Sequence, residues 1–226
     1  MLFNFTKDFQ FTTEITLKGE KLETIDKTKL LGTIITKGLK WHGNTKYLVR
    51  MANQKMRLLH KFSKFTKNKS HLMHIYKSQV RSSLEYCSTV WHSSLTQTDC
   101  SDIERVQKAA MKVIMGTRYQ GYQEALKFME IDSLKERRVK MALNFAKKSL
   151  RLDIFSSLFP LNENVHQMKT RNPERYVIKN GNTDRMKRSA VPFLQRLLND
   201  DINRQRKDLR NLLQVNNGIY FDAPIT

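Results

Sequence analysis

The first forty residues alternate short β-favouring runs with turn residues. The stretch FTTEITLKGEKLETI (11–25) holds two such runs on either side of Lys18, Gly19 and Glu20, a pattern typical of a β-hairpin. The next run, KLLGTIIT (29–36), is mostly apolar, which predicts a third strand that is buried on both faces. The pattern therefore predicts a small β segment over residues 1–40.

From Asn44, a residue suited to a helix N-cap, the period of the pattern becomes that of an α-helix. At 100° per residue one face collects apolar side chains, namely Tyr47, Leu48, Met51, Leu58, Leu59, Phe62 and Phe65. The far side, which also carries Asn53, collects basic side chains, namely Lys46, Arg50, Arg57, Lys61 and Lys64. Lys55 falls inside the apolar sector. The apolar face predicts core packing for a helix that reaches about Phe65.

Two further helices follow in the pattern. We expect one over about 71–92, capped by Ser70, and another over about 98–115, ended by Gly116. In the first of these, Cys87 falls on the apolar side with Val80 and Val90.

The remaining segments complete the predicted architecture. A short helix over 122–131 precedes one that begins at a Ser133–Glu136 capping box, and a final helix covers 192–213. The polar stretch 161–191 is interpreted as a linker, and the last dozen residues as frayed. The fold class is therefore α+β, mainly α, a β unit followed by a helical bundle. Its expected parts are a β segment over 1–40, a helical domain over 41–160, and a linker with a C-terminal helix over 161–226.

Net charge is the strongest compositional signal. Lys and Arg number 41 against 21 Asp and Glu, which gives a formal charge of +20 and a pI of about 10.1. Such a surface attracts polyanions, so nucleic acid is the favoured partner. The five basic residues of the first helix have no acidic residue among them, and they form either a solvated face or a phosphate-binding one. Second candidates for phosphate contacts are Lys108, Lys112, Arg137 and Arg138.

The segment SSLEYCSTVWHSSL (82–95), with the nearby Cys100, raises the question of a metal site. On one continuous helix Cys87 and His92 would lie about 140° apart around the axis, so they would not converge on a zinc ion. No C-x-x-C pair occurs in the sequence. These residues are therefore interpreted as packing positions, and His71 with His74 as a surface pair.

Catalytic signatures are missing from the sequence. It holds no phosphate-binding glycine loop and no G-x-S-x-G motif. The adjacent carboxylates Asp200 and Asp201 diverge by 100° on a helix, which favours a solvated acidic step over a two-metal site. We therefore expect no catalytic residue, metal or cofactor. With two cysteines, no leader pattern and no long apolar run, the chain is expected to be intracellular, nuclear or cytoplasmic, without a membrane partner.

Four stretches carry residues that occur together in one known family. The first, KLLGTIITKGLKWHGNTKYLVRMANQKMRLLHKF, holds Leu31, Gly32, Leu39, Trp41 and Asn44 and continues into the long basic helix. The second, IYKSQVRSSLEYCSTVWHSSL, holds Tyr76, Arg81, Leu84, Glu85, Tyr86, Val90 and Trp91. The third, DIERVQKAAMKVIMG, holds Glu104, Gln107, Lys108, Ala109 and Gly116. The fourth, TDRMKRSAVPFLQRLLN, holds Thr183, Arg185, Ser189, Pro192, Arg196 and Asn199.

In this order, over about residues 1–200, the stretches resemble the palm end, thumb and post-thumb region of reverse transcriptases from non-LTR retrotransposons, LINE-type elements of the jockey and CR1 kind. The resemblance implies a helical thumb that grips the backbone of a template–primer duplex or hybrid. The family's Tyr/Phe-x-Asp-Asp metal motif does not occur in this sequence. We therefore expect a non-catalytic nucleic-acid-binding remnant of an RNA-directed DNA polymerase, either a truncated element copy or a coding fragment that begins at an internal Met.

Two alternatives stay open. The chain is also consistent with an interaction module whose exposed apolar helix faces drive self-association or partner binding. The same segments resemble the N-terminal domain described for AlkB homologue eight, which is associated with tRNA-modifying dioxygenase and methyltransferase proteins. None of the six histidines is followed by x-Asp, as an iron-dependent dioxygenase requires, so that resemblance implies no dioxygenase site here.

Overall fold

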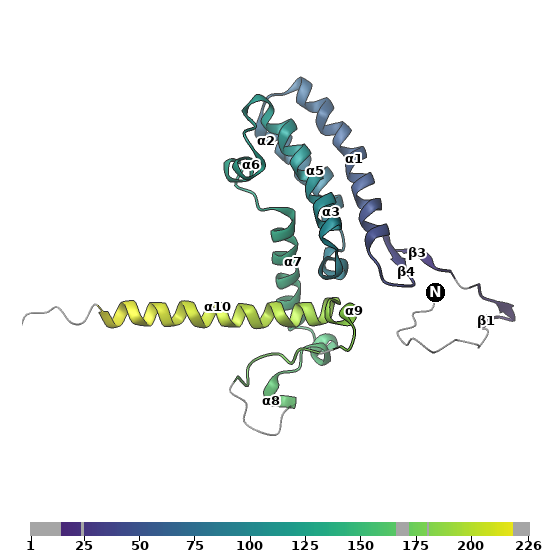
Figure 1. The fold of residues 1–226 in the computed structure, drawn as a ribbon, viewed down its shortest axis with the longest axis vertical. Coiled ribbons are helices and arrows are strands. Elements are labelled where there is room, and N and C mark those ends of the chain that lie inside the picture. The colour runs from purple at the N-terminus through teal and green to yellow at the C-terminus, as the bar shows by residue number, and fades with distance from the viewer. Residues whose placement is uncertain (1–14, 24, 166–171, 180, 219–226) are drawn as a thin grey trace, which may run out of the picture. The chain divides into compact units, whose positions relative to one another are not determined.

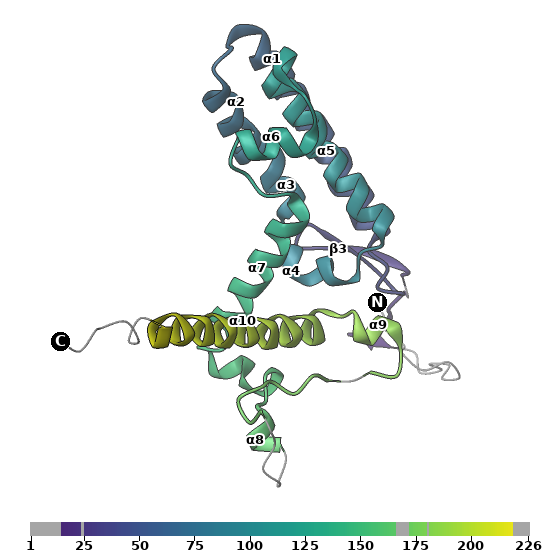
Figure 2. The ribbon, with the colours of Figure 1, turned by 60° about the vertical axis from the view of Figure 1, so that its left-hand side comes forward.

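The structure, a computed structural model, describes residues 15–23, 25–165, 172–179 and 181–218, with the side chains of the last helix as far as Asp208 (Figures 1 and 2). The chain divides into two compact units, unit 1 over 1–138 and unit 2 over 139–226. The predicted fold class is confirmed: two small antiparallel strand pairs precede a set of helices, so the fold is α+β and mainly α. The division falls within a helix, whereas the sequence placed segment boundaries at 40 and 160.

The first strand pair agrees with the sequence. Strands β1 (Thr16–Leu17) and β2 (Glu20–Lys21) pair antiparallel across Lys18 and Gly19. Both turn residues have positive φ, 50° and 85°, as a two-residue hairpin turn requires. Residues 11–14 and 24 of the predicted hairpin lie outside the described residues.

The prediction of one buried strand over 29–36 is wrong. The segment forms a second hairpin of β3 (Lys27–Leu30) and β4 (Thr33–Thr36), whose register pairs Leu30 with Thr33. Leu31 and Gly32 form the turn, with φ of 44° and 82°. β3 is mostly exposed, and only Thr33 and Ile34 of β4 are buried. An apolar run was interpreted as one strand because its turn residue, Leu31, is not a usual turn former.

Helix α1 (His42–Phe65) is confirmed, but Asn44 is not its N-cap. Trp41 occupies that position, and Asn44 lies inside the helix with 1% of its side chain exposed. Its Oδ1 accepts a hydrogen bond of 3.1 Å from the backbone N–H of Ile34. Asn44 therefore joins β4 to the start of α1, a tertiary role that an N-cap rule does not see.

The predicted continuous helix over 71–92 is wrong as well. The structure breaks it into α2 (Lys69–Ile75), a π-helical turn (Tyr76–Arg81), α3 (Ser82–Glu85), α4 (Ser88–Trp91) and a 3₁₀ turn (His92–Ser94). The cap of α2 is Asn68, whose Oδ1 accepts from the N–H groups of Ser70 and His71, rather than Ser70.

The break between α3 and α4 reverses the prediction for Cys87. This residue has a left-handed backbone, φ 52°, and its side chain is exposed instead of packed with Val80. His92, by contrast, is buried with 8% exposure. The geometric argument from one continuous helix therefore does not apply to these two residues.

The next helices follow the pattern closely. They are α5 (Gln97–Met115), a 3₁₀ turn (Gly116–Arg118), α6 (Tyr122–Phe128) and α7 (Leu134–Ser149). Gly116 ends α5 with φ 56°, and Ser133 and Glu136 form the predicted capping box before α7. The sequence analysis missed a second capping box, between Thr96 and Asp99, at the start of α5.

The core of unit 1 lies mainly where α1, α5 and the segment 69–91 pack together, and α1 and α5 run side by side (Figures 1 and 2). Its fully buried apolar side chains include Leu59, Tyr76, Leu84, Trp91, Ile103 and Met111. Gln107, also fully buried, accepts from the Tyr76 hydroxyl and donates to the Tyr122 hydroxyl and to the carbonyl of Asp132. A satisfied polar network of this kind fixes the angle at which α5 packs.

Unit 2 contains a 3₁₀ turn (Asp153–Leu158), α8 (Asn162–Val165), α9 (Asp184–Lys187) and α10 (Ala190–Gly218). The predicted final helix is therefore confirmed, with a longer extent at its C-terminal end. The predicted linker is partly ordered: Asn199 of α10 bonds both the N–H and the carbonyl of Tyr176, at 2.9 and 3.0 Å. Residues 166–171, 180 and 219–226 lie outside the described part. No helix among the described residues is long and apolar enough to cross a membrane.

Candidate nucleic-acid interface

The five basic residues predicted on the first helix share one narrow sector of α1. From helix geometry they occupy a sector of about 60° around the helix axis and span about 27 Å from the first to the last. We call this set the α1 basic face; it consists of Lys46, Arg50, Arg57, Lys61 and Lys64. Successive members are three or four residues apart, a rise of about 4.5–6 Å, except Arg50 and Arg57, which are seven residues or about 10.5 Å apart.

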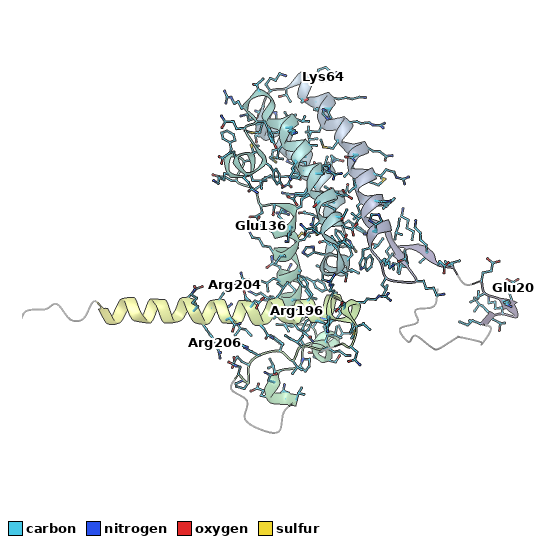
Figure 3. All side chains as sticks on the ribbon, viewed as in Figure 1. Glu20, Lys64, Glu136, Arg196, Arg204 and Arg206 are labelled. Carbon is cyan, nitrogen blue, oxygen red and sulfur yellow. The ribbon has the colours of Figure 1, made fainter. Side chains whose placement is uncertain are left out.

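Every member of the α1 basic face is exposed. Within the described residues, the structure shows none of the five in an ion pair or a side-chain hydrogen bond with the rest of the chain. Figure 3 labels Lys64, close to the C-terminal end of α1. Five cations without protein counter-ions on one rigid helix form a surface that favours an external anion.

The N-terminal half of the α1 basic face borders a hollow of about 560 Å³. Its lining residues are Thr45, Lys46, Val49, Arg50, Asn53, Gln54 and Arg57 of α1, together with Asp102 of α5. The carboxylate of Asp102 already pairs with Arg105 at 3.2 Å. The hollow is therefore lined by three cations and two amide side chains, and its single carboxylate is paired with a cation from outside it.

Tyr47 and Lys29 extend this surface, and the sequence analysis missed both contributions. The Lys29 ammonium donates a hydrogen bond of 2.9 Å to the Tyr47 hydroxyl and lies 4.7 Å from the ring centroid. The guanidinium of Arg50 lies 5.8 Å from the same centroid. The hydrogen bond from Lys29 is the main cause that lowers the pKa of Tyr47. Had Leu31 been recognised as a turn residue, the sequence would have predicted a hairpin beside α1 that carries Lys29.

Lys108 and Lys112 of α5 are not brought together with the α1 basic face. Both are exposed, and each lies over an aromatic ring, Lys108 at 5.3 Å from the Tyr122 centroid and Lys112 at 5.7 Å from that of Tyr119. Lys108 lines a separate hollow of about 260 Å³, which shares no residue with the first. Their predicted role in phosphate binding stays a prediction for a different surface.

Arg137 is held inside the unit by an ion pair. Its Nε and Nη2 donate to the two carboxylate oxygens of Glu85 at 2.6 and 3.1 Å, and Glu85 is 8% exposed. The carboxylate of Glu85 raises the pKa of Arg137 above its ordinary value. A guanidinium with a bidentate partner offers little to a phosphate, so Arg137 is not kept as a binding residue.

Arg138 is fully buried, which corrects its assignment as a surface residue. Its Nε donates to Nδ1 of His92 at 3.2 Å, and its guanidinium carbon lies 6.0 Å from the Trp91 ring centroid. Burial is the main cause that lowers the pKa of His92 to about 4, and the positive charge of Arg138 contributes to the same shift. His92 is therefore neutral at pH 7 and can accept the hydrogen bond from Arg138.

Three of the four stretches on which the family resemblance depends lie in unit 1, and several of their residues have structural roles there. The Tyr86 hydroxyl donates to the carbonyl of Leu31 at 2.9 Å, and Trp91 Nε1 donates to the carbonyl of Tyr86 at 3.0 Å. A Cβ at Gly32 would lie 3.3 Å from the Tyr86 ring. Four of the five members of the α1 basic face, all but Lys64, fall within the first of the four stretches, although none is among its named positions.

Carboxylate and metal candidates give no catalytic constellation in the described part of the chain. There, no three His, Cys, Asp or Glu side chains lie together as metal ligands would. Asp201, expected to be solvated, accepts from Lys147 at 2.7 Å and from Gln205 at 3.0 Å.

Comparisons of the chain with protein-family models, curated proteins and solved structures give no match. A function for the chain is therefore inferred from the geometry of the α1 basic face and from the residues of the chain itself.

Proposed function

We propose that unit 1 binds the phosphate backbone of duplex or hybrid nucleic acid through the α1 basic face, with little sequence preference and without catalysis. The role is that of the thumb in a non-LTR retrotransposon reverse transcriptase. The observation on which the proposal depends is the set of five exposed cations, unpaired within the described residues, along about 27 Å of one helix.

Charge spacing supports a nucleic-acid partner over a small anion. Double-stranded DNA carries one negative charge per about 1.7 Å of its axis, so a cationic row of this length meets many phosphates at once. Lysine and arginine contacts to phosphate position a protein on the backbone and carry no sequence information. The hollow bordered by Lys46, Arg50 and Arg57 gives the row a concave part that suits a sugar–phosphate chain.

The order of elements supports the thumb-like role. The β3–β4 hairpin, whose turn is formed by Leu31 and Gly32, leads through the buried Trp41 into the long basic helix α1. The resemblance places a Leu-Gly strand and a Leu-x-Trp before such a helix, so the order of the elements agrees with it.

The salt dependence of binding tests the proposal. Conversion of Arg50, Arg57 and Lys61 to Gln removes three cations from the α1 basic face and leaves its apolar side unchanged. Because each phosphate contact contributes about −0.9 to the slope of log K against log salt, we expect the slope to flatten by about two to three. Fluorescence anisotropy with a labelled RNA–DNA hybrid at several salt concentrations measures it.

A matched variant removes the same charge elsewhere in unit 1. Lys37, Lys77 and Arg118 are also exposed, and their conversion to Gln should change the slope by much less. Equal slopes for the two triple variants would show that net charge alone determines binding and would refute the α1 basic face. Circular dichroism checks that both variants keep their helix content.

Self-association is the second candidate function, and one observation favours it. Leu58, Phe62 and Phe65 are 40%, 43% and 88% exposed at the C-terminal end of α1, although the pattern assigned them to the core. Their spacing places all three on one side of the helix. Analytical ultracentrifugation distinguishes the candidates: a dimer that Phe62→Ser and Phe65→Ser dissolve would support the second one.

A further inference from the structure

A hollow rich in hydrogen-bond donors lies in unit 2, and it shares no residue with the surfaces described for unit 1. Its volume is about 440 Å³, and it is lined by Asn172, Arg175, Asn203, Arg206 and Lys207. Two of these residues precede α9 and three belong to α10. Each side chain can donate N–H groups, and the lining contains neither a carboxylate nor an apolar side chain.

The internal hydrogen bonds of the hollow direct its amide groups. Arg175 Nη2 donates to the Oδ1 of Asn203 at 2.6 Å, and Arg206 Nη1 donates to the Oδ1 of Asn172 at 3.1 Å. Each guanidinium therefore donates to the carbonyl oxygen of an asparagine. The NH₂ groups of Asn172 and Asn203 are the donors that the two amides can offer a ligand.

Charge in the hollow is only partly balanced. Glu174 pairs with Arg206 at 2.6 Å but does not line the hollow. Among the described residues, the buried Arg175 Nε has no hydrogen-bond partner. The lining carries three cations, of which Arg206 has a carboxylate partner, and such a surplus of positive charge favours an anionic ligand.

We propose that this hollow binds a phosphate group, held by the arginine and lysine charges and by the two asparagine amides. A tetrahedral oxyanion suits it because several oxygens can each accept from a donor of different direction, and guanidinium groups match phosphate geometry. The group can belong to a free phosphate compound or to a nucleic-acid backbone. The proposal does not depend on the α1 basic face, since all five lining residues belong to unit 2.

Asn203→Asp is the most direct test. The substitution keeps the size of the side chain and an acceptor for Arg175, but it replaces an amide donor with a negative charge. We expect calorimetric titration with pyrophosphate at 150 mM NaCl to show binding weakened about tenfold or more. Asn164→Asp is the matched control, because Asn164 is an exposed residue of the same unit, outside the lining.

A second pair of variants tests the hollow independently, in case Asn203→Asp does not fold. Lys207→Gln removes a lining charge that makes no ion pair or hydrogen bond within the described residues, and it should weaken binding by a smaller factor. Arg204→Gln is its control, because Arg204 does not line the hollow and points away from Arg206 (Figure 3). Circular dichroism confirms that the four variants keep their helix content.

Two ligands distinguish the sources of the phosphate. A loss seen with pyrophosphate assigns the hollow to free phosphate compounds, and a loss seen only with a twelve-nucleotide strand assigns it to a phosphodiester backbone. The triple variant of the α1 basic face should keep the pyrophosphate affinity, so failure of one proposal leaves the other intact. The proposal is overturned if each lining variant binds both ligands as its control does.

Discussion

His92 and Arg138 form a buried pair in which one partner has to be neutral. The imidazole accepts from the guanidinium at 3.2 Å, and both side chains are nearly or fully inaccessible. Protonation of His92 would remove the acceptor and place a second positive charge against Arg138. The pair therefore links the folding of unit 1 to pH.

We expect unit 1 to lose stability as the pH falls from about 6.5 to 4. The folded-state pKa of His92, about 4, lies below the ordinary value of 6.5, so the unfolded chain binds the proton more tightly. The contribution is fully present above the ordinary value and is lost progressively below it, up to about 3 kcal/mol. Urea unfolding at several pH values measures this loss.

His92→Asn isolates the effect from that of the carboxylates, which titrate in the same range. An asparagine Oδ1 can accept from Arg138 in place of Nδ1, and it has no proton to gain. The difference in the free energy of unfolding between wild type and variant should therefore change with pH between 6.5 and 4. A constant difference across that range would contradict the coupling.

The sequence correctly predicted which charged side chains of α1 are exposed, but it did not predict that Arg137 and Arg138 have partners inside unit 1. The amphipathic period of α1 correctly placed Lys46, Arg57 and the rest of the α1 basic face on the surface. On α7, by contrast, Arg137 and Arg138 were both assigned to the surface by composition. Their partners, Glu85 and His92, are 52 and 46 residues away in sequence, and no local pattern indicates such pairs.

Among the elements, the β3–β4 turn has an unfavourable residue. Leu31 has φ 44° and Gly32 has φ 82°, and 81% of the Leu31 side chain is exposed. A leucine in the left-handed region is strained by about 1–2 kcal/mol, and asparagine tolerates that region better. The contact that the turn makes to Tyr86 uses the Leu31 carbonyl, which any residue supplies.

Leu31→Asn should therefore stabilise unit 1 by about 1 kcal/mol, because it creates the Asn-Gly pair that such turns favour. Gly32→Ala should act in the opposite direction, since its φ is positive and its Cβ would crowd Tyr86. Thermal unfolding followed by circular dichroism compares the two variants with wild type. Equal or reversed shifts would show that the turn does not limit stability.

Helix prediction depended on caps and stops. The Ser133–Glu136 box and Gly116 are local signals, and the helices they mark were predicted well. The break at Tyr86 and Cys87 has no proline or glycine to announce it. Tertiary contacts accompany the break, including the hydrogen bond from the Tyr86 hydroxyl to the Leu31 carbonyl. Sequence periodicity does not register such contacts, so it predicted one continuous helix.

For the whole molecule, charge has two opposite consequences. A formal charge of +20 favours polyanions but also makes the folded chain repel itself. Screening shortens the range of this repulsion from about 30 Å at 0.01 M salt to about 10 Å at 0.1 M. The domain boundary was harder to predict than the charge, because it lies inside α7, where composition does not change.

The melting temperature should rise when NaCl increases from about 10 to 200 mM, because screening weakens the repulsion between like charges. Sodium phosphate of equal ionic strength should raise it further, since an anion that binds only the folded chain adds to its stability. Differential scanning fluorimetry at fixed pH makes the comparison. Identical curves in the two salts would count against specific phosphate sites.

Trp41 and Trp91, the two tryptophans of the chain, both belong to the core of unit 1. Unit 2 has aromatic side chains such as Phe159 and Tyr176 but no indole. Tryptophan emission excited at long wavelength therefore comes from one unit alone, whereas the far-ultraviolet signal of the helices comes from both. The chain consequently carries a natural optical label that reports the unfolding of unit 1 separately.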